Sequence, residues 1–165
     1  MAFDYLVEVK TESNYGSGTN ENVFLRLVGA RKTDGDWFLD KDGMDDLEAT
    51  ENNPCYFLLR TEEFLGEINS IIIYVEENKC DNDSPAWNLD YVNVYFKKGL
   101  PDEKKWNFPV YKWIGVQDRD PSIKMVNYIE IDQKGSIIKQ WAPTELTNGG
   151  ITKKKVENHG APIPS

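Results

Sequence analysis

The amino-acid sequence predicts an all-β protein, an antiparallel β-sandwich of about eight strands. Segments in which apolar and polar residues alternate recur along the chain, and stretches rich in Gly, Asn, Asp and Pro separate them. Residues 68–75 form the most apolar segment and are rich in β-branched side chains, which is typical of a central strand. No stretch of helical length repeats its apolar residues with the period of about 3.6 that an amphipathic helix requires, so no helix is expected.

The first half of the chain contains three further expected strands, at residues 5–9, 23–28 and 55–60. A strongly acidic connection covers residues 33–53, and a short strand is expected inside it at residues 37–39. Alternation in residues 5–9 and 23–28 predicts one face in the core and one face outside, whereas the facing of residues 55–60 is ambiguous from the pattern alone.

Residues 88–96 show the clearest alternation in the second half of the chain. The apolar side chains expected to face the core are Val92, Val94 and Phe96. The opposite face is expected to carry Tyr91, Asn93 and Tyr95.

Another strand is expected at residues 106–111, where Pro109 predicts an edge or a bulge because it cannot donate to a strand ladder. A weaker pair of strands follows at residues 126–131 and 136–139. We expect a folded domain over residues 1–141 and a linker or loosely ordered tail over 142–165, where Pro, Gly, Asn and Lys become frequent.

Composition narrows the possible partners of this 165-residue chain. Its net charge of −9 argues against nucleic acid, because binding to phosphates requires basic patches. The N-terminus has no basic region followed by an apolar run, so no signal peptide is expected. The expected location is therefore cytoplasmic, with peripheral association to a membrane.

The residues present limit the chemistry that this chain can perform. His159 is the only histidine and lies in the expected tail, so a Ser–His–Asp or Cys–His arrangement is not supported. The chain contains no P-loop and no dinucleotide-binding fingerprint. We expect no catalytic residues and no enzymatic activity from this chain alone.

The acidic segments have two interpretations. Clustered carboxylates repel one another unless a hard cation lies among them, and calcium prefers oxygen ligands from carboxylates, amides and backbone carbonyls. An EF-hand does not fit, because Gly43 at the sixth loop position would place Ala49 at the twelfth. The acidic residues therefore form either a calcium site assembled from several loops or a solvated acidic surface.

The order of several short motifs resembles a PLAT domain, also called LH2 or lipoxygenase homology domain. Residues 18–23 read Gly-Thr-Asn-Glu-Asn-Val, and residues 65–68 read Leu-Gly-Glu-Ile. Residues 83–87 read Asp-Ser-Pro-Ala-Trp, similar to polycystin-type domains. Residues 108–114 read Phe-Pro-Val-Tyr-Lys-Trp-Ile, similar to animal lipoxygenases. The resemblance is strongest over residues 5–114.

This resemblance implies a sandwich of two four-stranded antiparallel sheets and a non-catalytic module that brings a protein to membranes or partners, often with calcium. By position, it implies a calcium site that draws on three loops. The implied ligands are Gly18, Asn20, Asp45, Asp46, Glu48 and Asp83. Three positions differ from the family pattern, since Asn20 replaces the usual Asp, Ala86 lies where some lipoxygenases have Asp, and Asp45 replaces an Asn.

Membrane contact would require large side chains near the same loops, and the two candidates are Tyr15 and Trp37. The resemblance implies a phospholipid surface as the main partner, and a protein partner or a fused catalytic domain as further ones. Two alternatives stay open: a protein-interaction module that does not depend on lipid, and a carbohydrate-binding sandwich.

Overall fold

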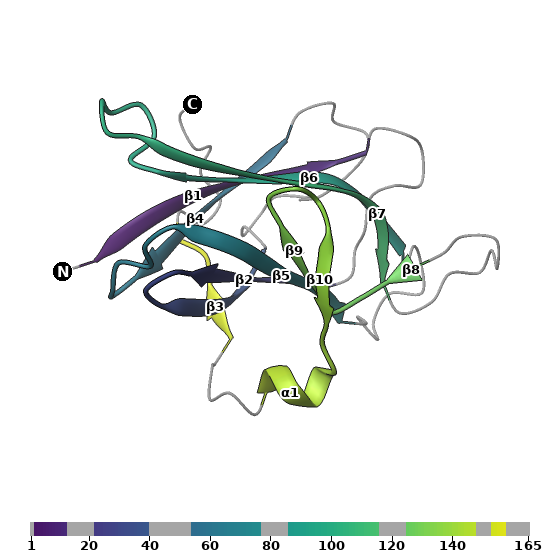
Figure 1. The fold of residues 1–165 in the computed structure, drawn as a ribbon. Helices are drawn as coiled ribbons and strands as arrows, with labels where there is room; N and C mark the ends of the chain where they lie inside the picture. Colours follow the sequence, from purple (N-terminus) through teal and green to yellow (C-terminus); the bar gives the residue numbers. More distant parts are fainter. Residues whose placement is uncertain are drawn as a thin grey trace.

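The computed structural model describes residues 2–12, 22–39, 54–76, 86–115, 125–147 and 153–157, and nearly all of its regular structure is β-strand (Figure 1). Two sheets pack as a sandwich, which confirms the predicted fold class. Sheet A has, in spatial order, β4 (Cys55–Thr61), β1 (Phe3–Thr11), β6 (Ala86–Phe96), β7 (Lys104–Gly115) and β8 (Met125–Val126). Sheet B has β10 (Ile137–Gln140), β9 (Ile129–Asp132), β5 (Ile68–Glu76), β2 (Asn22–Gly29), β3 (Thr33–Phe38) and β11 (Lys154–Lys155).

The strand count differs from the expected two sheets of four. Four antiparallel strands form the centre of each sheet, β4-β1-β6-β7 and β9-β5-β2-β3. The short strands β8 and β11 add to the edges in parallel, and β10 adds to β9. Each of the two parallel additions is only two residues long, too short for an alternating pattern to show in the sequence.

The hydrophobic core lies between the inner faces of the two sheets. In β6, Val92 and Val94 are fully buried and Phe96 is 9% exposed, which confirms the predicted alternation. They meet residues such as Leu25 and Ile73 from sheet B in one cluster. This packing fixes the register of both sheets, because a shift by one residue would turn each apolar set outward.

The strand expected at residues 126–131 is divided between the two sheets. Val126 pairs with Ile114 in sheet A, whereas Ile129 pairs with Ile73 in sheet B. Asn127 lies between them, and its side chain accepts a bond from the Val75 amide and donates to the Val75 carbonyl, both at 2.9 Å. The side chain of Asn127 thus replaces ladder bonds where the chain crosses from one sheet to the other.

Pro109 does lie beside an irregularity in β7, as predicted. Tyr91 pairs with Pro109 and Leu89 pairs with Lys112, so two residues of β7 face the single Asp90 of β6. Tyr111 at this bulge has a φ of 50° and is 68% exposed.

Residues 141–147 pack on the outer face of sheet B, and together with residues 153–157 we define them as the C-terminal strap. It includes helix α1 (Pro143–Thr147), which the sequence did not predict. Leu146 of α1 is 2% exposed and packs against Phe24 and Tyr74. Val156 is 1% exposed and belongs to the central core. These parts of the chain are therefore packed on the sandwich, which corrects the expectation of a linker or loose tail over these residues.

The strap also joins the open edges of the two sheets. On sheet B, β11 pairs with Trp37 and Phe38 of β3. On sheet A, the Glu157 amide donates to the Leu58 carbonyl of β4 at 2.8 Å. Val156 enters the core between these two contacts, so the strap closes the side of the sandwich between β3 and β4.

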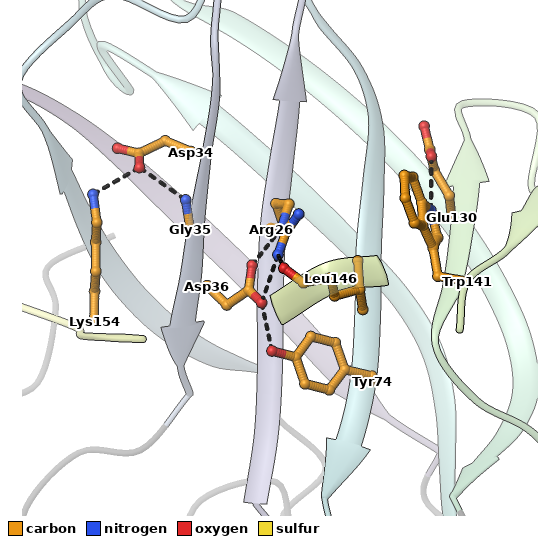
Figure 2. A network of polar contacts seen from close by, with 9 residues as sticks. All are labelled: Arg26, Asp34, Gly35, Asp36, Tyr74, Glu130, Trp141, Leu146 and Lys154. Carbon is orange, nitrogen blue, oxygen red and sulfur yellow. Dashed lines mark hydrogen bonds and ion pairs between the residues drawn. The ribbon is translucent and has the colours of Figure 1, made fainter. Parts of the chain in front are cut away.

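A buried ion pair connects the strap to sheet B (Figure 2). Arg26 donates to the two carboxylate oxygens of Asp36 at 2.5 and 3.0 Å, and also to the Leu146 carbonyl at 3.1 Å. Tyr74 donates its hydroxyl to the same carboxylate. Burial and the Asp36 carboxylate raise the pKa of Tyr74, so the hydroxyl keeps the proton it donates.

Candidate functional site

Three segments of the sequence, one rich in Gly, Ser and Asn and two acidic, leave the sandwich at one end. Strand register shows this, because Phe24 at the start of β2 pairs with Phe38 at the end of β3. Asn22 pairs with Glu76 at the end of β5, and Val9 near the end of β1 pairs with Cys55 at the start of β4. The strand ends that flank residues 13–21, 40–53 and 77–85 are thus neighbours, as a site assembled from several loops requires.

The predicted calcium ligands and one predicted membrane contact lie outside the described residues. They are Gly18, Asn20, Asp45, Asp46, Glu48, Asp83 and Tyr15. Their roles stay predictions, and what the structure adds is the common end at which their flanking strands meet.

Trp37, the other predicted membrane contact, is 1% exposed and packs in the central core. This part of the prediction is wrong, because a side chain in the core cannot reach a lipid surface. Strand β11 of the strap pairs with β3, the strand that contains Trp37. The ammonium of Lys154 lies 5.5 Å from the centre of the Trp37 ring. Trp37 and Leu39 are two positions apart in the sequence, and both are buried. Large apolar residues at this spacing could have indicated the core face of a strand.

Several carboxylates of the described residues lie near this end of the sandwich, among them Glu12, Asp90 and Glu76. Burial and the neighbouring Glu12 carboxylate raise the pKa of Asp90, and only Lys10 opposes them. On sheet B, Lys153 of the strap bonds to both oxygens of Glu76 at 2.7 and 2.8 Å.

Within the ranges that the structure describes, no three His, Cys, Asp or Glu side chains are grouped so that they could hold a metal ion. In the same ranges, no helix has the length and apolar character needed to cross a membrane.

Comparison with known proteins agrees with the strand order. A family model of the PLAT/LH2 domain matches residues 5–128. The chain belongs to the PLAT/LH2 family. The match ends before β9 begins, so β9, β10 and the strap lie beyond the part of this PLAT/LH2 domain that the family model matches.

Curated relatives include two proteins described as polycystin family receptor for egg jelly. The mouse protein is 28% identical over 145 residues, which cover 82% of this chain and 6% of the relative. The human protein is 34% identical over 112 residues, which cover 68% of this chain and 5% of the relative. The chain therefore spans only a small fraction of the length of the curated relatives it matches.

Solved structures share the fold at lower identity. Coral 8R-lipoxygenase, whose structure is described as showing calcium activation via a C2-like domain, superposes with a TM-score of 0.57 at 21% identity. That alignment covers 78% of this chain and 16% of the lipoxygenase. A lipoxygenase variant described as Delta413-417:GS LOX gives a TM-score of 0.58 at 21% identity, over 69% of this chain and 15% of the variant. These similarities support the sandwich and its topology.

Proposed function

We propose that this PLAT/LH2 domain is a non-catalytic module that binds calcium at the end where residues 13–21, 40–53 and 77–85 leave the sandwich, and that calcium promotes its association with phospholipid membranes. The observation that carries the proposal is the strand register, which brings the flanks of residues 13–21, 40–53 and 77–85 together. Calcium takes about six to eight oxygen ligands, a number that separate loops with carboxylates, amides and free carbonyls supply together.

The proposed ligand set combines three kinds of oxygen. Carboxylates come from Asp45, Asp46, Glu48 and Asp83, an amide oxygen from Asn20 and a backbone carbonyl from Gly18. Bound calcium would supply positive charge for lipid phosphates in a chain whose net charge is −9. Without calcium, that net charge opposes contact with an anionic membrane.

The burial of Trp37 makes calcium more important to this proposal. Tyr15 stays as the proposed aromatic contact, and insertion of one large side chain contributes only about 1.5–3 kcal/mol. Stable attachment requires a second contribution, so membrane binding should depend on calcium bridging to phosphates.

The similarity to coral 8R-lipoxygenase, described as calcium-activated via a C2-like domain, supports this proposal at the level of fold. Since the chain spans 16% of that enzyme, a fused catalytic domain is part of the proposal. Peripheral association at the cytoplasmic face of a membrane is the corresponding location.

Vesicle co-sedimentation tests the proposal. The domain should pellet with anionic vesicles when calcium is present and stay in solution with chelator. Asp45→Ala combined with Asp46→Ala should abolish pelleting. The matched control is Asp102→Ala with Glu103→Ala, an adjacent acidic pair in the β6–β7 turn at the opposite end, which should pellet like the wild type. Calcium-independent pelleting, or no difference between the two double variants, would overturn the proposal.

A further inference from the structure

The two outer faces of the sandwich differ in how they are covered. On sheet B, Leu146 of the strap packs against Phe24 and Tyr74. In Figure 1, α1 and the β9–β10 hairpin lie on the sheet B side, and no described helix or strand lies over the outer face of sheet A. Sheet A is therefore the broad face that the described part of the chain leaves open.

A single carboxylate organises the centre of this open face. Glu8 accepts hydrogen bonds from the hydroxyls of Tyr95 at 3.0 Å, Tyr91 at 3.3 Å and Tyr56 at 3.5 Å. It also accepts one from the Asn93 amide nitrogen at 3.2 Å. We call these five residues the tyrosine face. Strand register places them together, because Glu8 of β1 pairs with Tyr56 on one side and Asn93 on the other.

The tyrosine face is ordered before any partner arrives. Burial and the Glu8 carboxylate raise the pKa of Tyr91 and of Tyr95 to about 12, so their hydroxyls stay protonated as donors. Tyrosines fixed in this way offer a large contact area at a low cost in conformational entropy.

One polar atom of the tyrosine face lacks a partner. Asn93 is 8% exposed, its amide nitrogen bonds to Glu8, and its side-chain oxygen Oδ1 is buried without a hydrogen bond. A buried acceptor left unpaired costs free energy, so a bound water would be favourable here.

Two lysines lie at the edge of this face, beside the ring of Tyr95. Lys98 and Lys105 place their ammonium groups 5.4 and 5.3 Å from the centre of the Tyr95 ring. Within the described ranges, neither lysine forms an ion pair with a carboxylate. Other described lysines do, namely Lys32, Lys97, Lys104, Lys139, Lys153 and Lys154.

We infer that the outer face of sheet A docks an acidic protein segment, whose carboxylates meet Lys98 and Lys105 beside the Tyr95 ring. Charge complementarity identifies this occupant, because Lys98 and Lys105 place two ammonium groups at the edge of the tyrosine face and form no ion pair with a described carboxylate. Tyrosine at the centre with cations at the rim is also typical of protein interfaces. This inference is independent of calcium and of lipid.

A membrane is the weaker occupant for this face. Insertion into lipid requires apolar side chains at the surface, whereas the three tyrosines direct their hydroxyls to Glu8 and Leu6 beside them is 8% exposed. The face is also the side of a sheet rather than a protruding loop.

Nuclear magnetic resonance titration with a short poly-glutamate peptide tests the inference, with anionic vesicles as a second ligand. The peptide should shift the Asn93 side-chain amide and the Tyr95 ring signals. Lys98→Gln with Lys105→Gln should weaken its binding about tenfold, as expected for two lost ion pairs at an interface. The control, Lys134→Gln with Lys155→Gln, removes the same charge from exposed positions on sheet B and its edge.

Tyr91→Phe provides a second test that keeps the shape of the face. It removes one bond to Glu8 and should weaken the peptide about threefold without changing the fold. Three outcomes would overturn the inference. These are equal weakening by both lysine double variants, no shift at Asn93 in the wild type, or vesicle binding through Lys98 and Lys105 without peptide binding.

Discussion

Arg26 shows how one residue ties the strap to the sandwich. Its charge lies on the outer face of β2, where the side chain is 7% exposed, and its partners come from β3 and from α1. Removing one member of a buried ion pair leaves the other charge without compensation, which is far more costly than losing an exposed pair.

We therefore expect Arg26→Met to lower the free energy of unfolding by about 3–5 kcal/mol. Urea unfolding followed by tryptophan fluorescence would measure it. Asp4→Ala is the control, because its pair with Arg60 at 2.9 Å is exposed and should contribute about 0–1 kcal/mol. A loss below 1 kcal/mol for Arg26→Met would show that the buried pair is not needed for stability.

The phenols around Glu8 should make stability fall at alkaline pH. Folding raises the pKa of Tyr91 and Tyr95 from 10.0 to about 12, so between these values the folded chain keeps protons that the unfolded chain has lost. The folded state then binds more protons, and stability decreases as pH rises through this window.

Ultraviolet titration of phenolate absorbance should accordingly show tyrosines that ionise near pH 12. Glu8→Gln removes the nearby negative charge and should move them toward about 10, the ordinary value for tyrosine. An unchanged titration curve in this variant would mean that burial alone raises both pKa values.

Alternation along the sequence was enough to assign many residues to a face. Val92 and Val94 were predicted inward and Tyr91, Asn93 and Tyr95 outward, as the structure shows. That these outward side chains converge on Glu8 was not predictable, because Glu8 lies 83 positions before Tyr91 and meets it only through the register of β1 and β6. Trp37 was misplaced because an acidic neighbourhood in sequence was taken for a surface position.

At the scale of elements, the strap is the main departure from prediction. Helix α1 has five residues and β11 has two, so neither contains enough positions to show a period. The strap packs on the sandwich because other elements bury its few apolar residues. Leu146 lies beside Phe24, and Val156 lies between β3 and β4.

Val156→Ala tests whether the strap belongs to the folded unit. Loss of two buried methyl groups should lower the free energy of unfolding by about 1.5–3 kcal/mol, including the cavity that remains. Its exposed neighbour offers a matched control, since Lys155→Ala should change stability by less than about 0.5 kcal/mol. If both variants unfold at the same urea concentration, the strap does not contribute to the cooperative unit.

At the scale of the whole molecule, a site assembled from several loops is compatible with the strand register, which brings together the strand ends that flank residues 13–21, 40–53 and 77–85. Which of these oxygens bind calcium stays a prediction, since Asp45, Asp46 and Asp83 lie outside the described residues. The sequence pattern locates the strands, and the order of the strands determines which loops leave the sandwich at the same end. Ligand geometry depends instead on loop conformation, for which the sequence has no periodic signal.

Calcium should raise the stability of the whole domain if the proposed site is correct. A ligand that binds only the folded state at 100 times its Kd adds about 2.7 kcal/mol, and chelator should remove this gain. Differential scanning calorimetry would show the shift in Tm, and Asp45→Ala with Asp46→Ala should show none. Magnesium at the same concentration is the control, because it requires tighter octahedral geometry and keeps much of its water. An equal shift with both ions would indicate general charge screening.

The contacts of the strap with both sheet edges have a mechanical consequence. A pulling force applied to the chain beyond Glu157 reaches the Leu58 contact and the two residue pairs of β11 before it reaches any long strand. These few bonds would yield first and draw Val156 out of the core, while the longer ladders between β1, β6 and β7 still hold. Single-molecule extension should then show a short early step before the main unfolding event, so that tension opens the side between β3 and β4 before the sandwich itself is lost.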